Sequence, residues 1–267
     1  MIPIDDLLNT AVKASLEAGA EILKVYERDD VEVSSKQDNS PITLADKNAN
    51  RIIVSHLQET GIPIISEESK ALDYEERKKW KRCWIVDPLD GTKEFIKRNG
   101  EFTVNIALVE DGAPILGVIY VPVTKMLYFS DVKKKKAFRL RLEHFSEGYK
   151  TLAKELPQKR ELTSEVKIVG SRSHFSSETK KYIEKLNDDG KNITFVSVGS
   201  SLKFCLLAEG KANVYPRFSP TMEWDTAAGH AICKAVGFEV LHSETKKPLT
   251  YNKKELVNPS FVCETRF

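Results

Sequence analysis

Apolar residues recur at helical spacing in the first sixty residues of the chain. In 5–28, leucine, alanine, valine and isoleucine return every three or four positions on one face, which is typical of an amphipathic helix. A second helix is expected to open at 41–46, with Thr43 as its N-cap and Asp46 as the acid three residues later. Gly61 is expected to end it.

Strand-like patterns dominate the middle of the chain. The turn pair Asp111-Gly112 separates two of the strands as in a hairpin. The pattern therefore predicts an antiparallel meander flanked by the two early helices. Its strands, with those that lead into it, are expected at 62–65, 83–86, 102–110, 113–121, 126–130 and 136–142.

Strands and helices alternate after a polar, irregular stretch at 144–160. Such alternation is typical of an α/β arrangement. We therefore predict an α/β fold, with an α+β domain in 1–160 and an α/β domain in 161–267. The later strands are expected at 166–170, 193–198, 212–215, 238–241 and 261–263, and the helices at 176–187, 200–209 and 224–236.

The charge balance argues against binding to nucleic acid or to a membrane surface. The chain has 41 basic and 39 acidic residues and a formal net charge of +2. A charge this small does not attract the chain to nucleic acid or to an anionic membrane surface. No apolar run approaches the ~20 residues of a membrane span, and 1–6 lacks a basic, apolar secretory leader. Four scattered cysteines in apolar surroundings predict buried thiols in a reducing cytoplasm. Four lysines at 133–136 predict a solvated hairpin tip.

The candidate chemistry centres on 84–95, where an apolar run meets two acids. Pro88 cannot donate to a strand ladder and Gly91 permits a tight turn, so we expect the strand to stop at Asp87. Asp87 and Asp90 can converge on one point, where their repulsion calls for a cation. Oxygen ligands without nearby histidine or cysteine favour Mg²⁺ over Zn²⁺. An acidic surface turn is the plain alternative.

Two further acidic motifs accompany this stretch. Ser66-Glu67-Glu68 follows another apolar run, and Glu223-Trp224-Asp225 opens a helix of small residues. With Asp87-Pro88-Leu89-Asp90-Gly91-Thr92, they resemble the motifs of the inositol monophosphatase superfamily of Mg²⁺-dependent, Li⁺-sensitive phosphatases. Ser-Glu-Glu and Asp-Gly-Thr-Lys-Glu-Phe are similar to the 3′(2′),5′-bisphosphate nucleotidase branch. The motifs occur in the family's order over nearly the whole chain.

The resemblance implies a layered αβαβα sandwich that binds two Mg²⁺ ions. It implies that Glu67, Asp87 and the Leu89 carbonyl bind the first ion, and that Asp87, Asp90 and Asp225 bind the second. Such sites often bind a third, weaker Mg²⁺ near Glu67. Asp225 also has a plain interpretation as a helix-capping acid, which is compatible with metal binding.

Catalytic and substrate-binding residues are also implied by the resemblance. Asp46 and Thr92 would orient and deprotonate the attacking water, although an acid at the start of a helix is often only a cap. His174 would line the base or ribose pocket, or be a polar surface residue. The implied substrate contacts are Glu67, Leu89, Asp90, Gly91, Thr92, His174, Ser200, Lys203, Arg217 and Asp225.

Three of these residues would distinguish a bisphosphorylated substrate from a simple monophosphate. Ser200, Lys203 and Arg217 match the positions that contact the nucleotide and its second phosphate in the nucleotidase branch. The plain alternatives are helix capping by Ser200 or Ser201, and solvated surface cations at Lys203 and Arg217.

The activity implied is Mg²⁺-dependent hydrolysis of the 3′-phosphate of adenosine 3′,5′-bisphosphate to AMP. This reaction recycles a by-product of sulfate assimilation, and a small nucleotide is the expected partner. Inositol-1-monophosphatase, fructose-1,6-bisphosphatase and a non-catalytic nucleotide sensor are the alternatives. Lys93-Glu94 argues against the inositol phosphatases, which usually carry Thr-Asn there. Asp46 and Thr92 argue against a sensor, which needs no water-activating pair.

Overall fold

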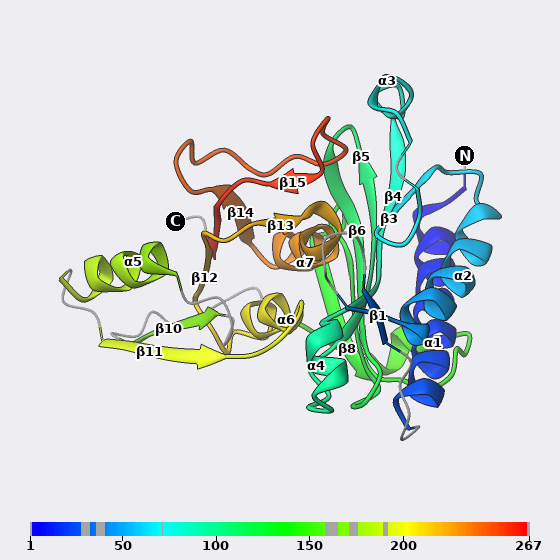
Figure 1. The fold of residues 1–267 in the computed structure, drawn as a ribbon, viewed down its shortest axis with the longest axis horizontal. Helices are drawn as coiled ribbons and strands as arrows, with labels where there is room; N and C mark the ends of the chain where they lie inside the picture. The colour runs from blue at the N-terminus through cyan, green and yellow to red at the C-terminus, as the bar shows by residue number, and fades with distance from the viewer. Residues whose placement is uncertain are drawn as a thin grey trace.

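The computed structural model describes residues 2–27, 33–35, 41–70, 72–157, 165–170, 176–188 and 192–265. Helices and sheets alternate in five layers (Figure 1). From the blue N-terminal helices across the molecule, the order is a helix pair, a large sheet, a second helix pair, a smaller sheet and a last helix. The expected αβαβα sandwich is confirmed.

The first layer consists of α1 (Ile4–Tyr26) and α2 (Leu44–Gln58). Asp5 and Asp6 lie in the first turn of α1 and Lys24 in its last turn, where each charge complements the helix dipole. The apolar faces of both helices pack on the large sheet and form one of two core clusters. Both helices were expected from their apolar periodicity.

The second helix, α2, begins at Leu44, directly after the residue predicted as its N-cap. The strand that precedes it was not predicted: Pro41–Thr43 forms β2, which pairs antiparallel with β1 (Val33–Ser35). Proline fixes φ at a value that extended backbone tolerates, and the β-branched residues that follow it favour a strand.

The second layer is a seven-stranded sheet with the order β3-β4-β5-β6-β7-β8-β9. β3 and β4 are parallel, and every other neighbouring pair is antiparallel. The meander predicted from strand-like segments separated by turns is confirmed. Its strands are β3 (Ile64–Ser66), β4 (Arg82–Asp90), β5 (Thr103–Glu110), β6 (Ala113–Val121), β7 (Met126–Asp131), β8 (Lys136–Arg141) and β9 (Lys154–Glu155).

The lysine run forms the exposed tip of the β7–β8 hairpin. Lys133 Nζ lies 2.8 Å from a Glu110 carboxylate oxygen, and Lys134 Nζ lies 3.0 Å from an Asp5 oxygen. Exposed pairs of this kind contribute little stability. The solvated hairpin tip expected from the sequence is confirmed.

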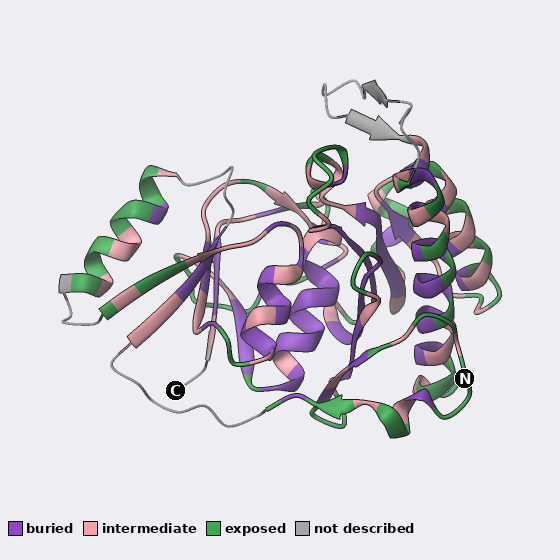
Figure 2. Ribbon diagram, turned by 90° about the horizontal axis from the view of Figure 1, so that it is seen from below, coloured by how far each residue is buried: buried purple, intermediate pink, exposed green. Residues whose placement is uncertain are grey.

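The middle layer consists of α6 (Leu202–Ala208) and α7 (Glu223–Ala235). α7 packs very closely on β6, because a Cβ atom at Gly117 would lie 2.4 Å from the Ala228 carbonyl oxygen. Nearly all of α7 is buried, as the purple central helix in Figure 2 shows. This close packing of α7 on β6 holds the first turn of α7, which contains Asp225, in place relative to the large sheet.

The last two layers are a five-stranded sheet and α5 (Ser177–Asp188), whose outer surface is largely exposed (Figure 2). β10 is parallel to β11 and β12, whereas β16 runs antiparallel to β12 and β14. The sheet order is β11 (Asn192–Ser197), β10 (Glu165–Gly170), β12 (Val214–Arg217), β16 (Phe261–Thr265) and β14 (Phe238–His242). The remaining elements are α3 (Tyr74–Arg77), α4 (Thr92–Ile96), the 3₁₀ turn η1 (Tyr149–Leu152), β13 (Thr221–Met222) and β15 (Val257–Asn258).

A second core cluster joins the large sheet, α6, α7 and the small sheet. The four cysteines are buried thiols, as predicted. Across the described ranges, no helix has both the length and the apolar character needed to cross a bilayer. The division into domains 1–160 and 161–267 stays a prediction.

Candidate active site

The acidic site lies at the end of β4, which contains Pro88 between Asp87 and Asp90. β4 pairs with β5 at Asp87 opposite Asn105 and again at Asp90 opposite Thr103, with an irregularity between them. The prediction that the strand stops at Asp87 is wrong, because the ladder resumes after Pro88, which cannot donate to it. In a regular strand, residues three apart face opposite sides. The irregularity brings Asp87 and Asp90 to the same side.

The turn after β4 leads directly into α4. Gly91 has φ of 94°, a left-handed backbone conformation that costs other residues energy. A Cβ atom there would also lie 3.1 Å from the Glu101 carbonyl oxygen. Thr92 begins α4, and its hydroxyl donates to the Leu89 carbonyl at 3.4 Å. The turn thus places Leu89, Gly91 and Thr92 together beside the two acids.

Acids from four elements surround this turn. Ligand oxygens of Asp87, Asp90 and Asp225 lie within 4.8 Å of one another, and Asp225 comes from the first turn of α7. Glu67 follows β3, and its backbone N–H donates to the Val86 carbonyl at 3.2 Å, which places it beside Asp87. Asp46 lies in the first turn of α2 and is buried. The predicted metal ligands are therefore brought together.

Burial and mutual repulsion make this cluster costly without a cation. The pKa of Asp87 is raised well above its usual value, first by burial and then by the charges of Glu67, Asp90, Asp225 and Asp46. The pKa of Asp225 is raised to about 8, again by burial first and then by Asp90. A set of hard oxygen donors that repel one another fits a divalent cation such as Mg²⁺. The cluster could hold a metal ion.

A cavity of about 120 Å³ adjoins the acidic cluster. Asp90 and Asp225 line this cavity together with Lys203 from α6 and Arg217 from β12. This arrangement places two cations beside two acids of the cluster. The full lining is Asp90, Gly91, Lys93, Glu94, Ser200, Lys203, Phe204, Tyr215, Arg217, Thr221, Asp225 and Thr226.

Lys203 is a buried cation. Its side chain is 6% exposed, its ammonium donates to the Ser200 carbonyl, and Nζ lies 5.5 Å from the centre of the Tyr215 ring. Burial lowers its pKa to about 8. The alternative interpretation of Lys203 as a solvated surface residue is therefore wrong. Arg217 is partly buried and donates from Nη2 to the Pro220 carbonyl at 3.4 Å.

The alternative interpretation of Ser200 or Ser201 as a helix cap is wrong, whereas the contact of Ser200 with a nucleotide stays a prediction. The helix was predicted to begin at Ser200, but α6 begins at Leu202, and Ser200 has φ of 54°. Neither Ser200 nor Ser201 caps the helix with its side chain; both hydroxyls donate to Asp90. A carboxylate is a stronger acceptor than a neutral partner, so Asp90 attracts both serines. His174 lies outside the described residues.

The sequence analysis missed Thr103 and Asn105. Both are buried on β5, and both belong to the hydrogen-bond network of Asp90. Two polar residues spaced i, i+2 in an otherwise apolar strand are the signal that could have revealed them, because they share one face.

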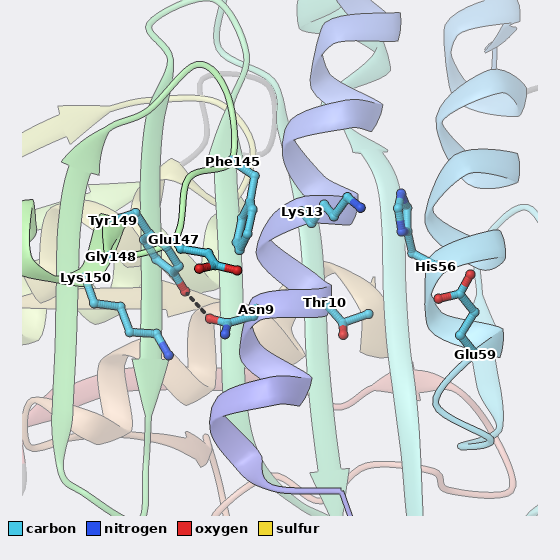
Figure 3. A pocket seen from close by; sticks show the side chains of 10 residues that line it. All are labelled: Asn9, Thr10, Lys13, His56, Glu59, Phe145, Glu147, Gly148, Tyr149 and Lys150. Carbon is cyan, nitrogen blue, oxygen red and sulfur yellow. Dashed lines mark hydrogen bonds between the residues drawn. The ribbon is translucent and has the colours of Figure 1, made fainter.

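A larger cavity of about 550 Å³ lies on the opposite side of the large sheet, between α1, α2 and the chain around η1 (Figure 3). Lys13 and His56 lie on its helical side, and Tyr149 donates to Asn9 at 3.3 Å across it. None of the predicted site residues lines it. It therefore has no part in the acidic site.

The sequence and the fold of this chain are similar to those of known CysQ proteins. CysQ proteins named 3′(2′),5′-bisphosphate nucleotidase from Shigella flexneri and Escherichia coli K12 are 45% and 44% identical over 259 residues, covering 96% of this chain and 98% of each relative. The crystal structure of CysQ from Bacteroides thetaiotaomicron superposes with a TM-score of 0.86 at 48% identity, covering 96% of both chains.

A solved structure of lower sequence identity shares the fold. Inositol monophosphatase-II from Staphylococcus aureus has a TM-score of 0.73 at 21% identity, covering 98% of this chain and 89% of that one. The model of the inositol monophosphatase family matches residues 4–265. Because this family model covers nearly the whole chain, and relatives that are 44–45% identical match it over 96% of its length, the chain belongs to the inositol monophosphatase family.

Proposed function

We propose that this protein is a Mg²⁺-dependent phosphatase that hydrolyses the 3′-phosphate of adenosine 3′,5′-bisphosphate and releases AMP. The observation that carries the proposal is the cavity in which two cations face the acidic cluster. Such a cavity fits a substrate with one phosphate at the metals and another some distance away. Relatives at 44–45% identity that carry the nucleotidase name support the same assignment.

The acidic residues divide into two overlapping ligand sets. Glu67, Asp87 and the Leu89 carbonyl would hold one Mg²⁺, and Asp87, Asp90 and Asp225 a second. Bound Mg²⁺ neutralises the phosphate dianion, lowers the pKa of water and stabilises the leaving oxygen. The raised pKa values of Asp87 and Asp225 support this role, because they come first from burial and then from repulsion between the acids, and a bound cation would stabilise the charged carboxylates against both.

Asp46 and Thr92 are assigned to the attacking water. Thr92 donates its proton to the Leu89 carbonyl, so its oxygen can accept a hydrogen bond from water and orient it. Asp46 is a buried carboxylate close enough to raise the pKa of Asp87, and it would accept the proton of that water. The backbone amides of Gly91 and Thr92 would donate to phosphate oxygens.

Lys203 and Arg217 would bind the 5′-phosphate. Each charge-assisted hydrogen bond to a phosphate can contribute roughly 1.5–3 kcal/mol. Inositol 1-phosphate has no second phosphate for these groups, which is why the two cations favour the bisphosphate. Lys93 also lines this cavity and is the residue that distinguishes the motif from the usual Thr-Asn of inositol phosphatases.

The proposal includes an arrangement of domains. We place most metal ligands in a first domain, 1–160, and Asp225 with the phosphate-binding cations in a second domain, 161–267. Substrate would then bind where the two domains meet.

A substrate panel tests the proposed function. Purified protein with Mg²⁺ is assayed for phosphate release from adenosine 3′,5′-bisphosphate, inositol 1-phosphate and fructose 1,6-bisphosphate, and kcat/KM is compared. We expect the nucleotide to be hydrolysed with the highest kcat/KM. A preference for either sugar phosphate would overturn the assignment, and nucleotide binding without phosphate release would identify a sensor.

A further inference from the structure

All side-chain hydrogen bonds that Asp90 accepts within the described residues end on one oxygen, Oδ2. Ser200 Oγ donates to it at 2.8 Å, Ser201 Oγ at 3.0 Å and Asn105 Nδ2 at 3.4 Å. A carboxylate oxygen has about two lone-pair sites, so any two of these three donors fill Oδ2. Oδ1 then remains available to a cation.

Thr103 and Asn105 form the base of this arrangement. Thr103 Oγ1 donates to Asn105 Oδ1 at 2.9 Å and lies 2.6 Å from Ser200 Oγ, whose single proton is donated either to Thr103 or to Asp90. By occupying the amide oxygen, Thr103 fixes the orientation of the Asn105 side chain, so that Nδ2 faces Asp90 and Ser201. Both residues are fully or almost fully buried on β5, where water does not compete for these bonds.

The same network connects the acids that come from two different elements. Ser201 donates to Asp90 at the end of β4 and lies 3.1 Å from the backbone carbonyl of Asp225 on α7. Asn105 Nδ2 donates to Ser201 at 2.9 Å. Changing the orientation of Thr103 or Asn105 would therefore move the contacts of both acids together.

We propose that Thr103, Asn105 and Ser201 are positioning residues, which orient the Asp90 carboxylate so that Oδ1 faces a divalent cation. None of the three has to touch substrate for this role. The inference rests on the metal-binding part of the proposed function. It predicts a loss of metal affinity when the network is cut, even in the absence of nucleotide.

The test uses variants that change one hydroxyl at a time. Thr103→Val keeps the shape of the side chain but removes the hydroxyl, Thr103→Ser keeps the hydroxyl, and Ser201→Ala removes a direct donor. Ser130→Ala is the matched control, because Ser130 is equally buried on β7 of the same sheet. Mn²⁺ binding to the metal-free full-length chain is measured by electron paramagnetic resonance, with unfolding temperatures recorded in parallel.

Groups that orient metal ligands typically contribute about 10- to 100-fold in affinity. We therefore expect Thr103→Val and Ser201→Ala to raise the Kd for Mn²⁺ by that factor, and Thr103→Ser and Ser130→Ala to leave it near the wild-type value. In the nucleotidase assay, excess Mg²⁺ should restore the turnover of Thr103→Val, with KM for the nucleotide unchanged.

Several results would overturn the inference. A Thr103→Val protein that unfolds at a lower temperature but binds Mn²⁺ normally would show a merely structural role. If Thr103→Ser loses as much Mn²⁺ affinity as Thr103→Val, the hydroxyl is not the group that matters, and the inference fails. If Ser130→Ala loses as much affinity as Thr103→Val, the loss is not specific to the network, and the inference fails as well. Wild-type protein that binds no Mn²⁺ would refute both the inference and the proposed function, whereas intact Mn²⁺ binding without nucleotidase activity would refute the proposed function alone.

Discussion

Replacement of Lys203 by methionine tests how the protein recognises a second phosphate. Methionine keeps an unbranched apolar stem in a site that is 6% exposed and removes only the ammonium. Burial already lowers the pKa of Lys203 to about 8, which shows that its charge is unfavourable in the folded protein. We therefore expect Lys203→Met to fold at least as well as the wild type.

The expected loss follows from one charge-assisted contact. A hydrogen bond from a buried ammonium to a phosphate contributes roughly 1.5–3 kcal/mol, and about 1.4 kcal/mol corresponds to a factor of ten. Lys203→Met should therefore lower kcat/KM for adenosine 3′,5′-bisphosphate by roughly ten- to a hundredfold. Activity on inositol 1-phosphate should barely change, because that substrate has no second phosphate.

The pH dependence provides a second signature of the same group. The ammonium is the form that binds phosphate, and it is present below a pKa of about 8 and lost above it. For the wild type, kcat/KM for the bisphosphate should therefore fall as the pH rises through about 8. At each pH, kcat/KM for the bisphosphate is divided by kcat/KM for inositol 1-phosphate. This ratio should fall above about pH 8 in the wild type and stay constant in Lys203→Met.

Steady-state phosphate release on both substrates, from pH 6 to 10, is the assay. Lys13→Met is the control, since Lys13 is an exposed lysine that lies outside the site and lines the cavity in Figure 3. Equal losses on both substrates, or no loss on either, would refute the assignment of Lys203 to the second phosphate.

Four further outcomes are expected. Asp90→Asn should lower turnover by orders of magnitude without unfolding the protein, and near-normal turnover at saturating Mg²⁺ would contradict its role as a ligand. Thr92→Ala and Asp46→Asn should each change kcat far more than KM. The double variant should lower kcat by less than the product of the two single decreases, and a decrease equal to that product would disprove a joint role. Millimolar Li⁺ should inhibit by competing with Mg²⁺, and unchanged activity would refute this point alone. Gly91→Ala should destabilise the fold by about 1–2 kcal/mol because of its left-handed backbone, and an unchanged free energy of unfolding would contradict that cost.

Elements with a strong apolar period could be predicted from the sequence. β6 spans the predicted residues 113–121, and every position after its first is buried, because a short apolar run between two turn signals is typical of a fully buried strand. The short strand Pro41–Thr43 was not predicted, because it depends on pairing with β1 and local periodicity does not show which segments pair.

The metal ligands could be predicted because short motifs carry them and because the motifs resemble those of a known family. Periodicity alone could not have placed Asp225 near Asp87, since they lie on different elements of the fold. The hydrogen bond from Ser200 to Asp90 and the contact of Thr103 with Ser200 were not predicted, for a related reason. A serine before a helix usually caps it, but here a carboxylate from another strand is the acceptor.

The central claim is tested most directly by one metal titration. Protein freed of metal is mixed with adenosine 3′,5′-bisphosphate, Mg²⁺ is added stepwise, and phosphate release is measured while the nucleotide product is identified by chromatography. We predict no phosphate release without Mg²⁺, activity that rises with Mg²⁺, and AMP as the product. Hydrolysis that persists in the presence of a chelator, or adenosine 3′-phosphate as the product, would contradict the account.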